Sequence, residues 1–347
     1  MKHMNNDTVY VVLLNWNGWQ DTVACLESLF ASQDVNFRVI VCDNASSDGS
    51  LEKIAAWADG HHAVEQPDNP RLARLLGKVS LPLRYVRMDR ATAESGALYD
   101  DAPLVLVDNG ANLGFAAGNN VGLRFALKQS EMDYVWILNN DTLVETDCLR
   151  NMLRRLRAAP VQSVCGSMIH FFDNPEIIQA MGGNRFNHRT GCAAMSEGRF
   201  THELARIDIG AIETEIDYIS GCSMLLPREF LNSVGLMSED YFLYYEEIDW
   251  FTRANSHYKI CVAKDARIYH REGAAIGSKS WRQSASTLSD FYMFRSRLTF
   301  MRKHYRRFLS LCYADSWMEV GKRVLRGHYD NAWTVGSVLL GKKSLGK

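Results

Sequence analysis

The sequence predicts an α/β fold with a mostly parallel central sheet, followed by a helical C-terminal extension. Two short apolar runs rich in β-branched residues, 9–14 and 37–42, flank an amphipathic segment at 21–30. Strand, helix and strand in this order form a βαβ unit, which favours a parallel sheet with right-handed crossovers. The 347 residues are 47% apolar and 23% charged, which supplies a core and excludes a disordered, collagen-like or coiled-coil chain.

The remaining elements follow from the same patterns. Strands are predicted at 104–107 and 134–138, with helices at 117–128 and 146–158. Before the strand at 104–107, the stretch 60–103 holds four of the seven prolines, which favours an insertion outside the sheet, as a surface segment rather than a lid over an acceptor. Beyond Pro160 the pattern indicates short strands, then a helix that begins near Glu246. The long stretch 288–313 is basic, aromatic and compatible with a helix.

Charge and cysteine usage restrict the binding partners and the cellular compartment. The net charge of −1 does not indicate a nucleic-acid binder, but 291–347 carries twelve Lys and Arg against three Asp and Glu, which predicts contact with an anionic surface. The eight cysteines include no Cys-x-x-Cys pair, which excludes a zinc framework and favours a reducing compartment. No signal peptide and no run of about 18 apolar residues is visible. We expect a cytoplasmic protein, soluble or peripheral on the inner face of the membrane.

Polar loops follow four of the predicted strands. In an open α/β sheet, ligands bind beyond the carboxyl ends of the strands. These ends carry residues 15–18, 43–44, 108–118 and 139–142, which are rich in Asn, Asp and Gly. Turn formation and helix capping explain any one such loop, but four at one edge favour a ligand-binding rim.

The rim does not match a dinucleotide site. The first turn reads Asn15-Trp16-Asn17-Gly18 instead of Gly-x-Gly-x-x-Gly, and no Walker A sequence occurs. A nucleotide can also be held by carboxylate and amide contacts to its base and ribose, with a metal neutralising its phosphates. Asp43 suits the first task and Asp141 the second.

A series of motifs in a fixed order carries a family resemblance. The motifs lie at 15–18, 43–50, 112–120, 138–142, 221–225, 241–249, His270 and 292–297. In this order they resemble the inverting family 2 glycosyltransferases of GT-A fold, the Rossmann-like fold of nucleotide-diphospho-sugar transferases. The rhamnosyltransferase-like branch is the most similar. The resemblance covers residues 8–305 apart from 60–103.

The resemblance implies a domain plan. A GT-A catalytic domain would span 1–287, with a nucleotide-binding part at 8–145, which contains the insertion at 60–103, and an acceptor part at 146–287. Residues 288–347 would form the basic, aromatic helical extension.

The resemblance also implies an activity. Such an enzyme transfers a sugar with inversion from a nucleotide-sugar donor to a hydroxyl of a cell-surface or lipid-linked glycan. The branch indicates dTDP-L-rhamnose as donor. The alternatives are a UDP-linked hexose or galactofuranose, or a catalytically silent domain that binds glycans or proteins. No nucleic-acid partner is expected, since no recognised module accompanies the basic stretch.

A metal site is implied at the family's Asp-x-Asp-type motif. Here this motif reads Asn139-Asn140-Asp141 and holds one carboxylate. His270 matches the family's later metal-ligand position, although its spacing alone favours an ordinary polar loop residue or a partner of a nearby carboxylate. The implied cofactor is Mg or Mn, whose remaining ligands would be diphosphate oxygens and waters.

The resemblance assigns the catalytic base to a carboxylate near residue 246. The family usually has Glu-Asp there, whereas this chain has Glu246-Glu247. Glu247 therefore takes the role of the base, and Glu246 is close enough to raise its pKa or share its proton. An acidic helix N-terminus stabilised by the helix dipole is the alternative explanation. Asp249 and Arg253, four residues apart, are predicted to form an ion pair on the helix surface or in the framework, without a catalytic role.

Donor binding is implied for residues of the rim. Trp16 either borders the nucleotide base or belongs to the core. The full predicted set is Asn15, Trp16, Asn17, Asp43, Asn44, Asn112, Gly114, Phe115, Asn119 and Asn140.

The stretch 291–310 has two explanations. Its arginines alternate with Phe291, Phe294, Phe300, Tyr305 and Phe308. A helix with this composition lies on an anionic leaflet with its aromatic side chains inserted, or it exposes a basic face while the aromatic side chains pack on the domain.

Overall fold

A computed structural model describes residues 7–96, 100–195, 208–255, 257–271 and 286–342. Five parallel strands form one half of its sheet: β1 (Thr8–Asn15), β2 (Asn36–Asp43), β3 (Tyr85–Asp89), β4 (Leu104–Asp108) and β5 (Met132–Asn139). β1 lies between β2 and β5, and β4 lies between β2 and β3. The four predicted strands are confirmed. Their register places Asn15 beside Asp43 and Leu14 beside Asn139, so the polar loops meet at one edge.

Side chains of β1 alternate between two apolar clusters, one on each face of the sheet. Tyr10 and Val12 lie in one cluster, which α5 (Gly114–Lys128) covers, and Val9, Val11 and Leu13 lie in the other. The helices α1 (Trp19–Phe30), α2 (Ser50–Ala58) and α6 (Cys148–Arg157) cover this second face. Burial on both faces explains why these strands are continuous apolar runs.

The segment 60–103 only partly leaves the sheet. It contains two short helices, α3 (Pro70–Ala73) and α4 (Arg90–Ser95), and the strand β3. β3 pairs with β4 in parallel and is the last strand at one end of the sheet. Residues 85–89 therefore belong to the sheet, as an edge strand, and the prediction that all of 60–103 lies outside it was wrong. Its short, half-buried pattern with Arg87 and Asp89 hides the strand from a search for apolar runs.

The second half of the sheet is mixed, with the strand order β10-β9-β8-β7-β12-β5. β12 (Ser223–Pro227) is antiparallel to both β5 and β7 (Ser163–Phe171). β13 (Lys259–His270) runs parallel to β7 and pairs antiparallel with β6 (Thr142–Val144). The prediction of short strands only was therefore wrong for β7 and β13. Polar residues such as Ser167 and His170 interrupt the apolar pattern of β7, yet the whole strand is buried.

Smaller elements complete the second half. They are β8 (Ile178–Met181), β9 (Gly183–Asn187), β10 (Cys192–Met195), α7 (Ile209–Glu215), β11 (Tyr218–Ile219), α8 (Arg228–Val234) and α9 (Glu246–Ala254). α9 begins at Glu246, as predicted.

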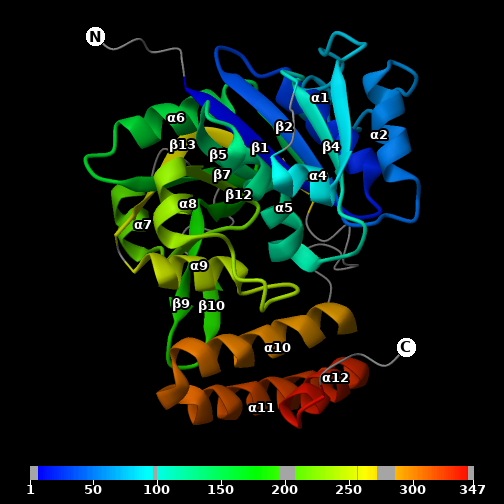
Figure 1. Ribbon diagram of the computed structural model, residues 1–347. Helices are drawn as coiled ribbons and strands as arrows, with labels where there is room; N and C mark the ends of the chain where they lie inside the picture. The colour runs from blue at the N-terminus through cyan, green and yellow to red at the C-terminus, as the bar shows by residue number, and fades with distance from the viewer. Residues whose placement is uncertain (1–6, 97–99, 196–207, 256, 272–285, 343–347) are drawn as a thin grey trace.

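The C-terminal extension is helical, as predicted. It contains α10 (Thr287–His304), a 3₁₀ turn (Arg306–Phe308), α11 (Leu309–Leu325) and α12 (Tyr329–Leu339). Figure 1 shows α10 between the α/β body and the pair α11 and α12. Within the described ranges, no helix combines the length and the hydropathy that a membrane span requires.

The aromatic side chains of α10 face the domain. Phe291, Phe294 and Phe300 are buried in the same cluster as α5, and Tyr305 and Phe308 pack against it. The insertion of Phe291, Phe294 and Phe300 into a leaflet is therefore incompatible with the fold, because these side chains are already buried. The second explanation for 291–310, with aromatic side chains packed on the domain, agrees with the structure.

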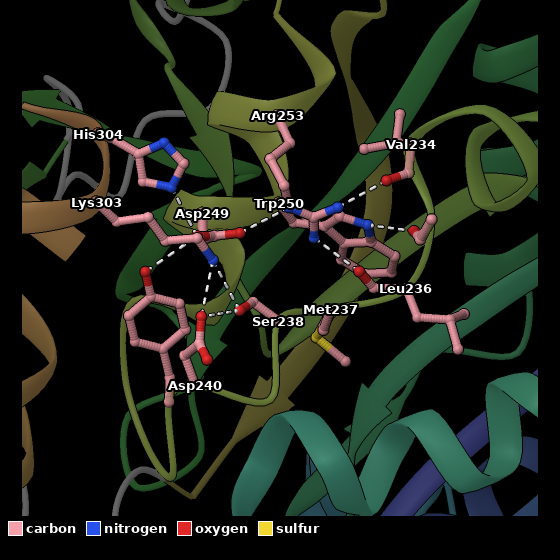
Figure 2. A network of polar contacts seen from close by, with 12 residues as sticks. Val234, Leu236, Met237, Ser238, Asp240, Asp249, Trp250, Arg253, Lys303 and His304 are labelled. Atoms are coloured by element: carbon pink, nitrogen blue, oxygen red, sulfur yellow. Dashed lines mark hydrogen bonds and ion pairs between the residues drawn. The ribbon is translucent and has the colours of Figure 1, made fainter. Parts of the chain in front are cut away.

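A buried carboxylate joins α9 to α10. Asp249 has no exposed surface, and its Oδ1 accepts a hydrogen bond from Arg253 Nε at 2.7 Å (Figure 2). Its Oδ2 accepts from Tyr241 Oη at 3.0 Å and lies 2.7 Å from His304 Nε2 and 3.0 Å from Lys303 Nζ. The predicted pair of Asp249 and Arg253 is thus part of the framework and not of the helix surface.

Candidate active site

The three residues predicted to surround a metal lie together. Asn139 ends β5, Asp141 follows it, and His270 ends β13, whose pairing with β6 places it opposite Thr142. His270 Nε2 lies 3.2 Å from Asp141 Oδ1 and 3.4 Å from Asn139 Nδ2. The antiparallel pairing of β13 with β6 therefore brings the distant His270 to the end of β5.

The imidazole of His270 is oriented by a residue that the sequence did not reveal. Its Nδ1 lies 3.0 Å from Gln179 Oε1, and because an amide oxygen only accepts, Nδ1 carries the proton. Nε2 then faces Asp141. Burial lowers the pKa of His270, but the neighbouring Cys222 and Asp141 outweigh burial and hold it well above its ordinary value.

The donor set fits part of a divalent metal site. Apart from its contact with His270, Asp141 Oδ1 is buried without a hydrogen-bond partner in the described residues. A carboxylate, an imidazole and an amide suit Mg or Mn. No group of three or more His, Cys, Asp or Glu in the described ranges can hold a metal by itself.

The residues predicted to bind the nucleotide sugar at the ends of β1, β2 and β5 form one polar network. Asn15 Nδ2 donates to Asp43 Oδ1 at 2.6 Å, and Asn15 Oδ1 accepts from Asn140 Nδ2 at 3.3 Å. Asp43 also accepts from the backbone N–H of Ser46 at 2.9 Å, so this nearly buried carboxylate shapes its own loop. Asn15 thus links the ends of β2 and β5.

The loop after β1 is held to the loop after β2. The backbone N–H of Ser47 donates to Asn17 Oδ1 at 2.7 Å. Asn17 is exposed, and its φ of 52° is tolerated better by Asn than by most residues. The neighbouring Trp16 is half-buried.

The loop before α5 is fixed to the segment before α9. The backbone N–H of Phe115 donates to the carbonyl oxygen of Phe242 at 2.8 Å. Gly114 has a φ of +80°, and a Cβ there would lie 2.9 Å from Phe242 Cα, so only glycine fits. Asn44 Nδ2 donates to the Gly114 carbonyl at 3.0 Å, and Asn112 Oδ1 accepts from the Gly114 N–H at 3.1 Å. The donor rim and the start of α9 are therefore directly connected.

Two further asparagines support this loop. Asn119 Nδ2 donates to the Phe115 carbonyl at 2.9 Å, within α5. Asn109, which the sequence did not single out, donates through Nδ2 to Asn44 Oδ1 at 2.8 Å. Its position directly after β4, beside the predicted loop, is the signal that could have identified it.

The two glutamates at the start of α9 are held in a strained turn. Tyr244 and Tyr245 have φ values of 67° and 74°, a conformation that costs about 1–3 kcal/mol for each such residue. Burial and the charge of Glu247 raise the pKa of Glu246 well above its ordinary value, and Glu246 Oε2 has no hydrogen-bond partner in the described ranges. Burial also raises the pKa of Glu247, although backbone N–H groups partly offset this. Strain and raised pKa values together are typical of a functional site.

One dipeptide connects Glu247 to the candidate metal ligands. The backbone N–H of Gly221 donates to the Glu247 carboxylate, and a Cβ on Gly221 would lie 2.9 Å from Glu247 Cδ. The Cys222 side chain contacts His270, and the Cys222 carbonyl accepts from the Asn139 N–H at 3.0 Å. The motif at 221–225 was recognised in the sequence, but the linking role of this dipeptide was not.

Comparisons with known proteins show what the chain is similar to. The sequence model described as "Glycosyl transferase family 2" matches residues 88–232. The chain is similar to the "Low-salt glycan biosynthesis hexosyltransferase Agl10" of Haloferax volcanii, with 23% identity over 190 residues. This match covers 53% of the chain and only 57% of that protein, so the chain spans little more than half the length of the curated relative.

Two solved structures share the fold. The mannosyltransferase PcManGT from Pyrobaculum calidifontis, in complex with GDP-Man and Mn²⁺, aligns with a TM-score of 0.50 and 16% identity over 97% of this chain and 76% of its own. GalNAc-T7 with UDP, GalNAc and Mn²⁺ aligns with a TM-score of 0.52 and 13% identity over 86% of this chain and 48% of its own. At these identities the likeness concerns the fold alone. The chain thus has a GT-A-like α/β fold with C-terminal helices, and its residues 88–232 match the model of glycosyl transferase family 2.

Proposed function

We propose that this protein is an inverting glycosyltransferase that moves a sugar from a nucleoside diphosphate to an acceptor hydroxyl. One observation carries the proposal: Asp141 and His270 meet beside Cys222, and Glu247 contacts the adjacent Gly221. The predicted donor-binding loops are joined to the segment before Glu247 through the Phe115–Phe242 hydrogen bond. The match to the family model and to a hexosyltransferase supports the same activity.

The rim residues bind the donor nucleotide in this proposal. Asp43 and Asn15 are held rigidly by their mutual hydrogen bond, and the half-buried Trp16 lies beside them with an aromatic face for the base. Asn17, Asn44, Asn112, Gly114, Phe115, Asn119 and Asn140 shape or line the same edge. A rigid rim lowers the entropic cost of ordering the nucleotide.

Asp141 and His270 would hold a divalent cation, with the Asn139 amide beside them. Such a cation, Mg or Mn, neutralises charge on the departing diphosphate when it is bound. Gln179 keeps Nε2 of His270 directed toward Asp141, since its oxygen holds the Nδ1 proton.

Glu247 is the proposed base. The acceptor oxygen forms a bond to the anomeric carbon, the bond from that carbon to the diphosphate oxygen breaks, and the Glu247 carboxylate takes the acceptor proton. A raised pKa makes this carboxylate a stronger base, provided that it is ionised. The Gly221 N–H hydrogen bond fixes its position.

The identities of the donor sugar and of the acceptor are also proposed. The sequence motifs favour dTDP-L-rhamnose, whereas the curated relative is a hexosyltransferase, which supports a UDP- or GDP-linked hexose as the second candidate. The proposed acceptor is a cell-surface or lipid-linked glycan.

A donor panel separates these candidates. Thermal shifts with Mn²⁺ and dTDP-rhamnose, UDP-glucose, UDP-galactofuranose or GDP-mannose identify the donor, and a transfer assay with the stabilising donor measures turnover. Glu247→Gln should keep the thermal shift and lose about 10²–10⁴-fold in turnover. Donor binding without turnover in the wild-type chain would favour a silent binding domain, and unchanged turnover in Glu247→Gln would exclude Glu247 as the base.

A further inference from the structure

Exposed apolar side chains gather on the last two helices. Among the described residues, nine large apolar side chains are exposed, and of these nine only Val161 lies outside the C-terminal extension. We call the other eight the outer apolar face: Leu311, Trp317, Met318, Val324, Leu325, Tyr329, Trp333 and Leu340. Such a cluster on a soluble surface indicates an interaction site.

Helix geometry places three of the α11 members in one stripe. Leu311, Met318 and Leu325 are seven residues apart, which returns each to nearly the same side of the helix. Cys312 and Ser316, on the opposite side, are buried. α11 therefore packs on the extension through one face and presents its apolar face outward.

The stripe continues onto α12. Trp333 and Leu340 are seven residues apart and 77% and 80% exposed. A Cβ built on Gly336, which lies between them, would be 3.8 Å from Cζ3 of Trp317 on α11. The two helices form the layer farthest from the sheet (Figure 1).

Basic residues border the outer apolar face. Arg306 and Arg307 precede α11, Arg326 follows it, and Lys342 follows α12; all four are exposed. No ion pair to Arg306, Arg307 or Arg326 occurs within the described part of the chain. The acidic Asp315 and Glu319 are instead engaged by Arg297 and Arg323.

We propose that the outer apolar face docks on an anionic lipid bilayer. Apolar and aromatic side chains would enter the boundary between headgroups and acyl chains, and the bordering arginines would meet the anionic headgroups. A second copy of the chain is the less suitable partner, because a symmetric pairing sets this face against itself and brings like charges together. This docking does not depend on the proposed glycosyl transfer.

Vesicle sedimentation tests the proposal with the full chain. Phosphatidylcholine vesicles with and without phosphatidylglycerol are compared, and the wild-type chain should partition onto the anionic vesicles. Leu325→Ser combined with Trp333→Ser should lower the partition coefficient at least about tenfold. Val161→Ser, on the α/β body, is the matched control and should bind like the wild type.

A charge variant tests the contribution of the bordering arginines to vesicle binding. Arg306→Gln combined with Arg307→Gln should lower binding to phosphatidylglycerol vesicles about tenfold and leave binding to pure phosphatidylcholine unchanged. Circular dichroism and thermal melting confirm that the exposed substitutions keep the fold. The proposal is overturned if the wild type ignores anionic vesicles or if the apolar variant binds them equally well. It is also overturned if the chain dimerises in solution through this face without binding vesicles.

Discussion

Replacing Gly221 by alanine tests whether the position of the Glu247 carboxylate controls turnover. The added Cβ would lie 2.9 Å from Glu247 Cδ and 3.2 Å from its Cγ, whereas ordinary contact begins at 3.4 Å. The carboxylate must therefore move by at least 0.5 Å at Cδ. Its hydrogen bond from the Gly221 N–H is then weakened or lost.

The expected effect is large for catalysis and small for stability. A displacement approaching 1 Å costs up to about 100-fold in rate, so kcat should fall roughly 10–100-fold, or about 1.4–2.7 kcal/mol in activation free energy. The obstructing atoms belong to the end of a flexible side chain, which can rotate away. The free energy of unfolding should therefore fall by only about 1 kcal/mol.

Steady-state kinetics and urea denaturation measure the two quantities separately. Gly321→Ala, in α11, is the matched control because no atom lies within 4 Å of its added Cβ. In a Glu247→Gln background, Gly221→Ala should cost no further activity, since the base is already absent. A folded Gly221→Ala variant with wild-type kcat would refute the reasoning, and so would full additivity of the two changes.

Three further predictions concern charged groups. Burial raises the pKa of Glu246 above 4.5, so the folded chain keeps a proton that the unfolded chain loses, and the free energy of unfolding falls as pH rises above 4.5. Glu246→Gln should reduce this pH dependence, measured as urea midpoints at pH 5 and 8. An unchanged pH dependence would contradict the prediction. Asp249→Ala removes a buried partner of Arg253 and Lys303 and should cost about 3–5 kcal/mol in urea denaturation; a loss below 1 kcal/mol would show that the network is weak. Asp141→Asn should weaken Mn²⁺ binding at least about tenfold, which electron paramagnetic resonance of free Mn²⁺ measures; equal affinity would exclude Asp141 as a ligand.

The parallel half of the fold was predictable because its strands are buried on both faces. Residues 9–13 and 39–42 are buried throughout, so each strand is visible as an apolar run. β7 and β13 are just as central, but polar residues interrupt them and conceal their length. β3 is an edge strand with only intermediate burial and gives no such signal.

Some contacts of the candidate site were also predictable from the sequence, and others were not. Asn15 and Asp43 follow adjacent strands, so parallel pairing alone brings them together. His270 reaches Asp141 through β13, whose path no local pattern reveals, and only the family resemblance predicted the pair. Gln179 and Cys222 act through contacts across the sheet, and such contacts leave no trace in local sequence spacing.

The extension also shows a limit of composition. Both α10 and α11 combine basic and apolar residues, but α10 turns its aromatic side chains inward and α11 turns apolar side chains outward. Composition alone therefore did not distinguish the helix that buries its aromatic side chains from the helix that exposes apolar ones. Which face is covered depends on tertiary packing, which a single sequence does not specify.

The carboxylate of Asp249 sets a limit on protein engineering. A chain truncated before Thr287 would lose Lys303 and His304 and leave this buried anion with Arg253 and Tyr241 alone. It would also uncover the pocket that Phe291 and Phe300 fill. Expression of residues 1–286 as a minimal catalytic fragment should therefore yield insoluble protein, and crystallisation trials should keep the chain at least through His304.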